Sequence, residues 1–216
     1  MRAVVLLSGG LDSLVAAALT RAEAALVLAL TCDYGQRAAA REAEAARLQA
    51  QWLGCPHEVI ALPWLGALGG NALTDPARTL PEPSAEQLDA AEITTESARA
   101  VWVPNRNGVL VNVAAAYAER LAAEWVVCGF NAEEAATFPD NSRAFMQAAD
   151  GLWQYSTATG VRLYSPTADL DKPEIVRRGR ALGAPLELVW SCYLGEAEQC
   201  GRCESCRRLS RALHSL

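Results

Sequence analysis

The first residues suited to chemistry form the run Ser8–Ser13, with the sequence SGGLDS, near the start of this 216-residue chain. Glycines let a backbone approach a ligand closely, and serine hydroxyls can donate hydrogen bonds to phosphate oxygens. A helix that begins here would aim its free amides and the positive end of its dipole at the same place. The run therefore predicts a loop that grips the pyrophosphate of a nucleotide, with an ordinary glycine turn as the alternative.

Asp12 has the wrong charge for an anion site, so we expect it to cap the first helix or to reach a magnesium ion bound by the phosphates. The run lacks the lysine and spacing of a Walker A motif, and it is not GxGxxG. It is similar to the PP-loop of ATP pyrophosphatases, which adenylate a carboxylate or carbonyl oxygen and release pyrophosphate. The ATP contacts that this resemblance implies are Leu7, Ser8, Gly9, Gly10, Leu11, Asp12, Ser13, Leu14, Val15, Ala16 and Ala17.

A second group is formed by four cysteines near the C-terminus, with seven, two and two residues between them. Two-residue gaps let successive thiolates converge on one ion, and four thiolates close a tetrahedral zinc shell that leaves no position for water. We therefore expect one structural zinc ion per chain, with an iron–sulfur cluster as the main alternative. The predicted ligands are Cys192, Cys200, Cys203 and Cys206.

Basic residues surround these cysteines and raise the possibility of a nucleic-acid-binding zinc ribbon. The alternatives are a solvated helix face or charge compensation for a negative zinc–thiolate centre. The formal net charge of -6 disfavours nucleic acid, because phosphate neutralisation needs clustered cations. We favour small-molecule partners and no nucleic acid. The basic residues are Arg202, Arg207, Arg208 and Arg211.

Short apolar runs alternate with helical patterns along most of the chain, which predicts an α/β fold. Such alternation implies a Rossmann-like parallel five-stranded sheet with flanking helices, whose ligands collect beyond the carboxyl ends of the strands. The expected strands are residues 2–7, 25–32, 58–62, 125–129 and 161–164, and the expected helices are 12–21, 37–53, 108–122, 142–159 and 173–182.

The chain divides into a nucleotide-binding domain, residues 1–188, and a zinc-binding segment, residues 189–216, packed on that domain. Residues 63–97 show no sustained periodicity and are interpreted as an insertion that forms a lid or a subunit contact. No apolar run suffices for a signal peptide or a membrane span, so we expect a cytoplasmic protein with no membrane partner. In that compartment, the three remaining cysteines are expected in the core: Cys32, Cys55 and Cys128.

Taken with the cysteines, the loop resembles the 7-cyano-7-deazaguanine synthase (QueC) family over nearly the whole chain. The family's Val-Pro-x-Arg-Asn motif is matched by Val103–Asn107. The family often has an aspartate and the sequence Tyr-Pro-Asp-Cys-Arg where this chain has Glu134 and Asn141. Other family-like stretches are Tyr34–Arg37, Asn71–Thr74, Phe138–Asp140, Ser165–Lys172 and Trp190–Tyr193.

The resemblance implies a carbon–nitrogen ligase that converts 7-carboxy-7-deazaguanine, ammonia and ATP into the nitrile preQ0, through an adenylated carboxylate and an amide. It also implies magnesium with ATP, and a homodimer. A diverged ligase for another carboxylate or a macromolecular acceptor is the alternative, and a nucleic-acid-binding zinc ribbon is a weaker one.

Several polar residues of the family-like stretches are candidates for contacts with phosphate, substrate or magnesium. The arginines and the lysine suit phosphate or carboxylate, and the acids suit magnesium or an aminopyrimidine edge. Surface ion pairs and helix capping are the alternatives. Trp102 can stack on a base, while most tryptophans and both histidines are interpreted as structural or surface residues. The candidates are Gln36, Arg37, Arg106, Asn107, Glu134, Asp140 and Lys172.

Overall fold

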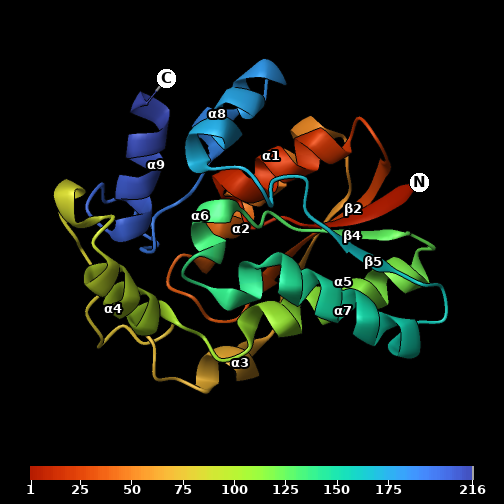
Figure 1. Ribbon diagram of the computed structural model, residues 1–216, viewed down its shortest axis with the longest axis horizontal. Coiled ribbons are helices and arrows are strands. Elements are labelled where there is room, and N and C mark those ends of the chain that lie inside the picture. The colour runs from red at the N-terminus through yellow and green to blue at the C-terminus, as the bar shows by residue number, and fades with distance from the viewer. Residues whose placement is uncertain (216) are drawn as a thin grey trace.

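The computed structural model describes residues 1–215, and its centre is a parallel sheet in the order β3-β2-β1-β4-β5 (Figure 1). The predicted Rossmann-like sheet of five strands is confirmed. The chain moves outward from β1 to β3, then returns to the other side of β1, so the switch point lies between β1 and β4. The strands are β1 (Arg2–Leu6), β2 (Ala25–Asp33), β3 (His57–Ala61), β4 (Trp125–Val127) and β5 (Arg162–Tyr164).

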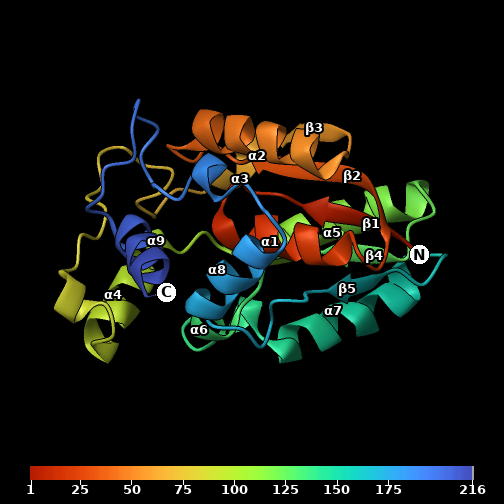
Figure 2. The same cartoon turned by 90° about the horizontal axis from the view of Figure 1, so that it is seen from above.

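Helices cover both faces of the sheet, because successive strand residues point to opposite sides. In β1, Val5 packs among the alanines of α1 and α2, while Val4 packs toward α5 and α7. Trp153 is fully buried in this second layer. Figures 1 and 2 show the two layers, with α8 lying against α1. These helices are α1 (Leu11–Thr20), α2 (Ala39–Leu53), α5 (Arg106–Arg120), α7 (Arg143–Ser156) and α8 (Lys172–Ala181).

The predicted helices begin within two residues of their observed starts, and two of these differences bear on the site. Helix α1 begins at Leu11, with Gly10 at its N-cap and no capping side chain, so the prediction that Asp12 caps it is wrong. Asp12 already lies in the first turn and its carboxylate reaches Lys172 instead. Helix α5 begins at Arg106, two residues earlier than predicted, after Asn105 turns the chain with a φ of 52°.

The insertion is more ordered than its composition indicates. It contains α4, which the sequence analysis missed because only Ser97 and Val101 of that helix are buried, too few to produce an apolar stripe. Leu65 and Leu73 join a separate core beside the end of β2. The helical segments of this region are α3 (Pro63–Ala67), η1 (Ala85–Gln87) and α4 (Ala91–Val101).

The C-terminal helix α9 (Glu204–His214) lies beside the insertion (Figure 2). The Glu204 amide donates to the Pro81 carbonyl at 3.2 Å, and Arg211 pairs with Asp89 at 2.7 Å. The insertion and the cysteine-rich tail therefore hold each other in place. The remaining short turns are α6 (Ala132–Ala135), η2 (Pro139–Asn141) and η3 (Leu186–Leu188).

The three cysteines outside the tail are buried, as predicted: Cys32, Cys55 and Cys128. Within the described residues, no helix is both long and apolar enough to cross a bilayer.

Candidate active site

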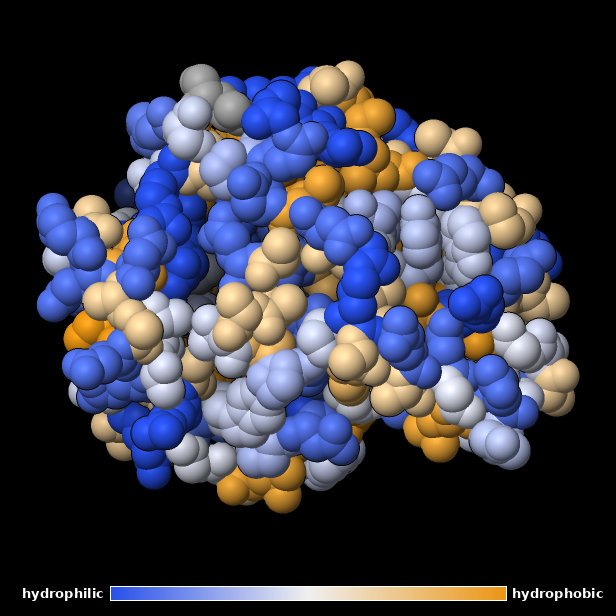
Figure 3. All heavy atoms as spheres, viewed as in Figure 1, coloured by the Kyte–Doolittle hydropathy of each residue, from blue (hydrophilic) through white to orange (hydrophobic). Residues whose placement is uncertain are grey.

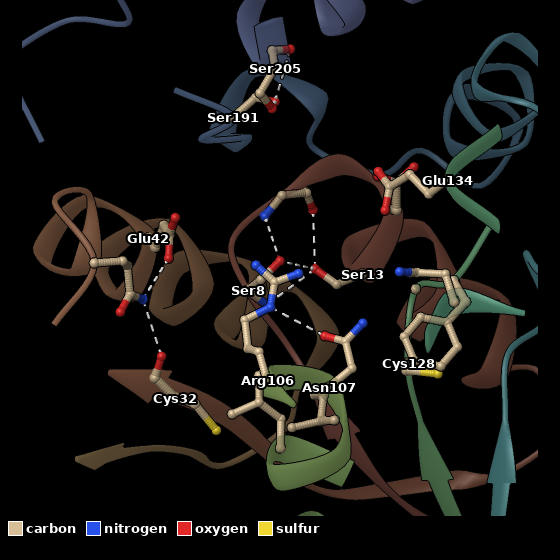
Figure 4. Close-up of a pocket in the computed structure, with 18 of the residues that line it drawn as sticks. Ser8, Ser13, Cys32, Glu42, Arg106, Asn107, Cys128, Glu134, Ser191 and Ser205 are labelled. Atoms are coloured by element: carbon tan, nitrogen blue, oxygen red, sulfur yellow. Dashed lines mark hydrogen bonds between the residues drawn. The ribbon is translucent and has the colours of Figure 1, made fainter. Parts of the chain in front are cut away.

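A cleft of about 330 Å³ opens at the carboxyl ends of β1, β2 and β4. Parallel α/β sheets bind ligands at this edge, beside the switch point. Figure 4 shows the side chains of Ser8, Ser13, Arg106, Asn107 and Glu134 converging there from three parts of the chain.

The loop after β1 is closed by its own serines. Ser8 and Ser13 hydroxyls lie 3.0 Å apart, and the Gly10 amide donates to Ser8 Oγ at 3.3 Å. The first amides of a helix have no partner within it, so the start of α1 faces the cleft with free donors. This local geometry suits an anion held by backbone amides and hydroxyls.

Gly9 sits where no side chain fits. Its φ is +80°, and a Cβ at this position would lie 2.5 Å from the Glu42 carbonyl oxygen. The Gly9 carbonyl accepts hydrogen bonds from Gln49 Nε2 at 2.7 Å and from the Trp190 amide at 3.0 Å. Helix α2 and the segment leading to the cysteines therefore both fix the loop.

Lys172 crosses the cleft from the start of α8 and joins two carboxylates. Its Nζ lies 2.8 Å from Asp12 Oδ2 and 3.0 Å from Glu134 Oε1. The side chain of Lys172 is only 10% exposed, so this lysine is not the solvated residue that a helix start would suggest. The structure thus brings together three residues that are far apart in the sequence.

The charges of this group do not cancel. Burial lowers the pKa of Lys172, but Asp12 and Glu134 outweigh that effect and the net shift is upward. Burial raises the pKa of Asp12 above its ordinary value despite the opposing Lys172 charge, and Glu134 adds to the rise. Asp12 Oδ1 is buried and accepts no hydrogen bond from the described residues. Two carboxylates for one ammonium leave room for a further cation.

Arg106 lies across the cleft on the first turn of α5. Its Nε donates to Asn107 Oδ1 at 3.3 Å, and Asn107 Nδ2 donates to the Asp140 carbonyl at 3.3 Å. Burial lowers the pKa of the guanidinium, but Tyr34 and Asp140 outweigh it and the net shift is upward. A fixed, charged guanidinium beside a phosphate loop can bind carboxylate or phosphate bidentately.

Gln36 is brought to the cleft, but its side-chain amide is occupied by protein groups. Its Nε2 donates to Glu42 Oε2 at 2.8 Å and to the Cys32 carbonyl at 3.2 Å, while Oε1 accepts from the Tyr34 amide. Gln36 therefore fixes the loop and orients Glu42. Burial raises the pKa of that glutamate.

Other predicted residues lie elsewhere. Arg37 does not line the cleft, because its guanidinium donates to the carbonyls of Asp75 and Arg78 in the insertion. Gly9 lies behind the loop, against α2. Four of the predicted ATP-contact residues are buried in the helical core instead of lining the cleft: Leu14, Val15, Ala16 and Ala17.

The structure also adds cleft residues that sequence reasoning did not select. Glu42 belongs to a helix whose pattern marks only its alanine face, so nothing in the sequence distinguished it. Ser191 and Ser205 are paired at 2.8 Å on the tail and also line the cleft. Ser191 lies in the family-like stretch Trp190–Tyr193, whereas Ser205 was marked only by its place beside Cys206.

The four tail cysteines form one cluster, with all four Sγ atoms within 4.8 Å of one another. Tetrahedral zinc with Zn–S bonds of about 2.3 Å needs S–S separations of about 3.8 Å, and Cys200 and Cys206 already lie at 3.9 Å. The Leu194 and Cys200 amides donate to Cys192 Sγ. Hydrogen bonding with Cys206 holds the pKa of the Cys203 thiol below its ordinary value. This cluster can hold a metal ion.

Sequence comparison now identifies the family. The model of the family described as "Queuosine biosynthesis protein QueC" matches residues 2–216. The chain belongs to the QueC family. Relatives named 7-cyano-7-deazaguanine synthase include one from Desulforamulus reducens, 54% identical over 216 residues, which are 100% of this chain and 95% of that protein. Another, from Methanosarcina barkeri, is 47% identical over 215 residues, covering 98% of this chain and 93% of the relative.

A solved structure shares the fold of this QueC family member. The crystal structure of a 4-thiouridine synthetase–RNA complex with bound ATP matches 98% of this chain and 49% of that chain, with a TM-score of 0.52 and 18% sequence identity. At this identity the similarity extends to the fold alone.

Proposed function

We propose that this QueC family member is a carbon–nitrogen ligase that converts 7-carboxy-7-deazaguanine and ammonia into 7-cyano-7-deazaguanine (preQ0) at the expense of ATP, in queuosine biosynthesis. Relatives of that name align over the full chain. The observation that carries the proposal is the cleft in which the Ser8–Ser13 loop, Lys172 and Arg106 come together.

The first half of the reaction makes an amide. A substrate carboxylate oxygen attacks the α-phosphorus of ATP, and the P–O bond to pyrophosphate breaks. The Ser8–Ser13 loop would hold the departing pyrophosphate on fixed amides and hydroxyls, which need no reorganisation as charge develops. Ammonia then attacks the acyl carbon and AMP leaves, because AMP is a far better leaving group than oxide.

The second half turns the amide into a nitrile. The amide oxygen attacks the α-phosphorus of a second ATP, and pyrophosphate leaves again. Loss of AMP and of both protons on nitrogen then gives the carbon–nitrogen triple bond. In this scheme Arg106 binds the substrate carboxylate or the α-phosphate, and the same cleft serves both adenylations.

The acidic side of the cleft fits a magnesium ion carried in with ATP. Asp12 Oδ1 lacks a partner among the described residues, and Asp12 and Glu134 exceed the charge of Lys172. Carboxylate oxygens are the ligands that magnesium prefers. When bound, the ion would neutralise phosphate charge, while Lys172 keeps the two carboxylates in position.

The cysteine cluster fits a resident zinc ion with a structural role. Four thiolates complete its shell, so the ion has no open position for substrate. It would hold the Trp190–Tyr193 segment against the cleft and α9 against the insertion. Free cysteines also suit the reducing cytoplasm.

We further propose a homodimer and no nucleic-acid partner. Trp64 on α3 and Leu68 directly after it, 53% and 58% exposed, offer an apolar surface for a second copy.

Product analysis tests the proposed function. The protein is incubated with 7-carboxy-7-deazaguanine, ATP and ammonium, and the nucleotides and bases are separated. We expect the nitrile, AMP and pyrophosphate, each dependent on all three substrates. Formation of ADP and phosphate would contradict adenylation. ATP–pyrophosphate exchange with another carboxylate, and none with the deazapurine, would instead favour a diverged ligase.

A further inference from the structure

Two aromatic rings stand parallel beside the cleft. Trp102, just after α4, and Phe138, just before η2, have ring centroids 6.2 Å apart and planes only 4° from parallel. Trp102 is 38% exposed. Two stacked rings in direct contact have planes about 3.5 Å apart. Because the centroids are farther apart than this, the two rings must be offset sideways and overlap little. Each ring therefore keeps much of its face available to a third planar group.

These rings lie where two hollows meet. Both line the cleft that holds the phosphate loop, and both line a groove of about 860 Å³ between α4, α6 and α9. Figure 3 shows the surface hollowed on the side of the molecule that carries α4 and α9. A planar ligand can therefore reach the rings through the groove even when a nucleotide fills the cleft.

A carboxylate follows the second ring by two residues. Asp140 is positioned by Asn107, which donates to its carbonyl, and by Asn141, whose Nδ2 lies 3.3 Å from Asp140 Oδ1. Asp140 Oδ2 accepts no hydrogen bond from any residue in the part of the chain that the structure describes. Arg106, on the other side of Asn107, is a cation whose charge acts on the Asp140 carboxylate.

The two rings share the cleft with the phosphate loop but come from other segments of the chain. In doubly wound sheets the nucleoside end of a nucleotide lies toward the strand after the phosphate loop, here β2, and a second substrate lies across the switch point. Phe138 follows β4 in the chain and packs against the core beside the end of β2, Trp102 precedes α5, and both rings line the same cleft as Arg106 and the phosphate loop. A base bound at the rings would thus direct a substituent toward the phosphate loop.

We propose that Trp102, Phe138 and Asp140 form the site that selects the base of the second substrate, a guanine-type ring. This inference rests on the proposed function. The planar ring stacks on Trp102 and Phe138, and Asp140 accepts hydrogen bonds from the ring N–H and the 2-amino group, which are both donors. The substrate carboxylate then faces Arg106. An adenine-type edge places an acceptor opposite the carboxylate, so this site rejects the base of ATP.

Steady-state kinetics on the full chain, with each substrate varied in turn, tests the site. Stacking on an aromatic ring predicts that Trp102→Ala raises the KM for 7-carboxy-7-deazaguanine about 10-fold or more and leaves the KM for ATP unchanged. Trp102→Phe keeps a ring, so its KM stays within about threefold of wild type on the same grounds. Tyr155→Ala is the matched control, because Tyr155 is an exposed aromatic residue that lines neither hollow.

Asp140 is tested with a changed ligand. For wild type, the analogue that lacks the 2-amino group should bind about 10-fold or more weakly than the full base, because one hydrogen bond to a carboxylate is lost. Asp140→Asn should bind the two ligands about equally. Binding without ATP is followed by quenching of tryptophan fluorescence, which Trp102→Phe should largely remove.

The outcomes separate this site from the proposed function. An unchanged KM for the deazapurine in a folded Trp102→Ala protein that still makes nitrile overturns the site and leaves the function. Equal discrimination against the analogue by wild type and Asp140→Asn also overturns it. Quenching by the deazapurine that depends on Trp102, without any turnover by wild type, supports the site and overturns the function.

Discussion

Lys172 Nζ lies 2.8 Å from Asp12 Oδ2, although 160 positions separate the two residues in the sequence. The contact ties the start of α8 to the phosphate loop, and Glu134 completes the group from the loop after β4. Three segments that each follow or precede a strand are thereby fixed around one cleft by one buried ammonium.

Removal of this ammonium should cost both stability and activity. Lys172→Ala leaves two carboxylates without their cation, so we expect the free energy of unfolding to fall by about 3 kcal/mol, the lower end for a broken buried pair because Glu134 is 37% exposed. ATP turnover should fall at least about 100-fold, because the two carboxylates beside the phosphate loop lose the cation that keeps them in position. Urea denaturation and the product assay measure the two effects.

A double mutant distinguishes an interaction from a general defect. Asp12→Ala should lower the free energy of unfolding less in the Lys172→Ala background than in the wild type, with a coupling energy of at least about 1 kcal/mol. The matched control is Arg178→Ala on the same helix. Arg178 forms an exposed ion pair with Glu174, and this pair should contribute about 0.5 kcal/mol or less to the free energy of unfolding. Additive effects of Lys172 and Asp12 would show that the contact is not energetically important.

The phosphate loop should not tolerate a side chain at Gly9. Gly9→Ala combines an unfavourable φ with a Cβ 2.5 Å from the Glu42 carbonyl oxygen, so the loop must shift and ATP binding should weaken about 10-fold or more. Gly35→Ala has a similar φ of +88° but no atom within 4 Å, and should cost only about 1 kcal/mol of stability. Calorimetric titration with ATP compares the two variants. Equal affinities of the two variants for ATP would contradict the assignment of Ser8–Ser13 as the phosphate loop.

The metal centre should bind about one zinc ion per chain, as four thiolates require. Cys203→Ser should lose the metal in elemental analysis, lower the melting temperature and increase proteolysis near residues 80–90, because α9 holds that segment. Cys55→Ser removes a buried thiol far from the cluster and should keep the metal. Full metal content in the Cys203→Ser protein, or unchanged folding without metal, would argue against a structural zinc site.

His57 should make stability depend on pH in the weakly acidic range. It contacts Thr31 Oγ1 at 2.8 Å, and partial burial lowers its pKa below the ordinary 6.5. Because the unfolded chain then binds a proton more readily, stability falls as pH drops below 6.5 and through the lower folded value. His57→Gln should remove this part of the slope between pH 7 and 5. Parallel slopes for the two proteins would show that His57 does not contribute.

The sequence pattern was sufficient for the sheet and the phosphate loop, because both depend on local features. Apolar runs such as Arg2–Leu6 report directly on backbone structure. The spacing of the four cysteines likewise indicated a cluster. The partners of a long side chain depend on tertiary packing, so neither the bond from Lys172 to Asp12 nor the turn of Arg37 toward the insertion was visible in the sequence.

Helix α4 could likewise not be predicted from the sequence. Its face toward the protein buries only two side chains, and its other side borders the groove, so no periodicity was available to predict it. Glu42 was missed for a related reason. It is polar on a helix with many polar residues, and only its approach to Gln36 and Gly9 marks it as part of the cleft.

Isotope transfer from the substrate tests adenylation most directly. 7-Carboxy-7-deazaguanine with both carboxylate oxygens replaced by ¹⁸O is converted with ATP and ammonium, and the products are examined by mass spectrometry. Each carboxylate oxygen should leave bound to phosphorus, so every AMP formed in the two steps carries one ¹⁸O and the pyrophosphate carries none. Unlabelled AMP, or ¹⁸O recovered in inorganic phosphate beside ADP, would contradict the account.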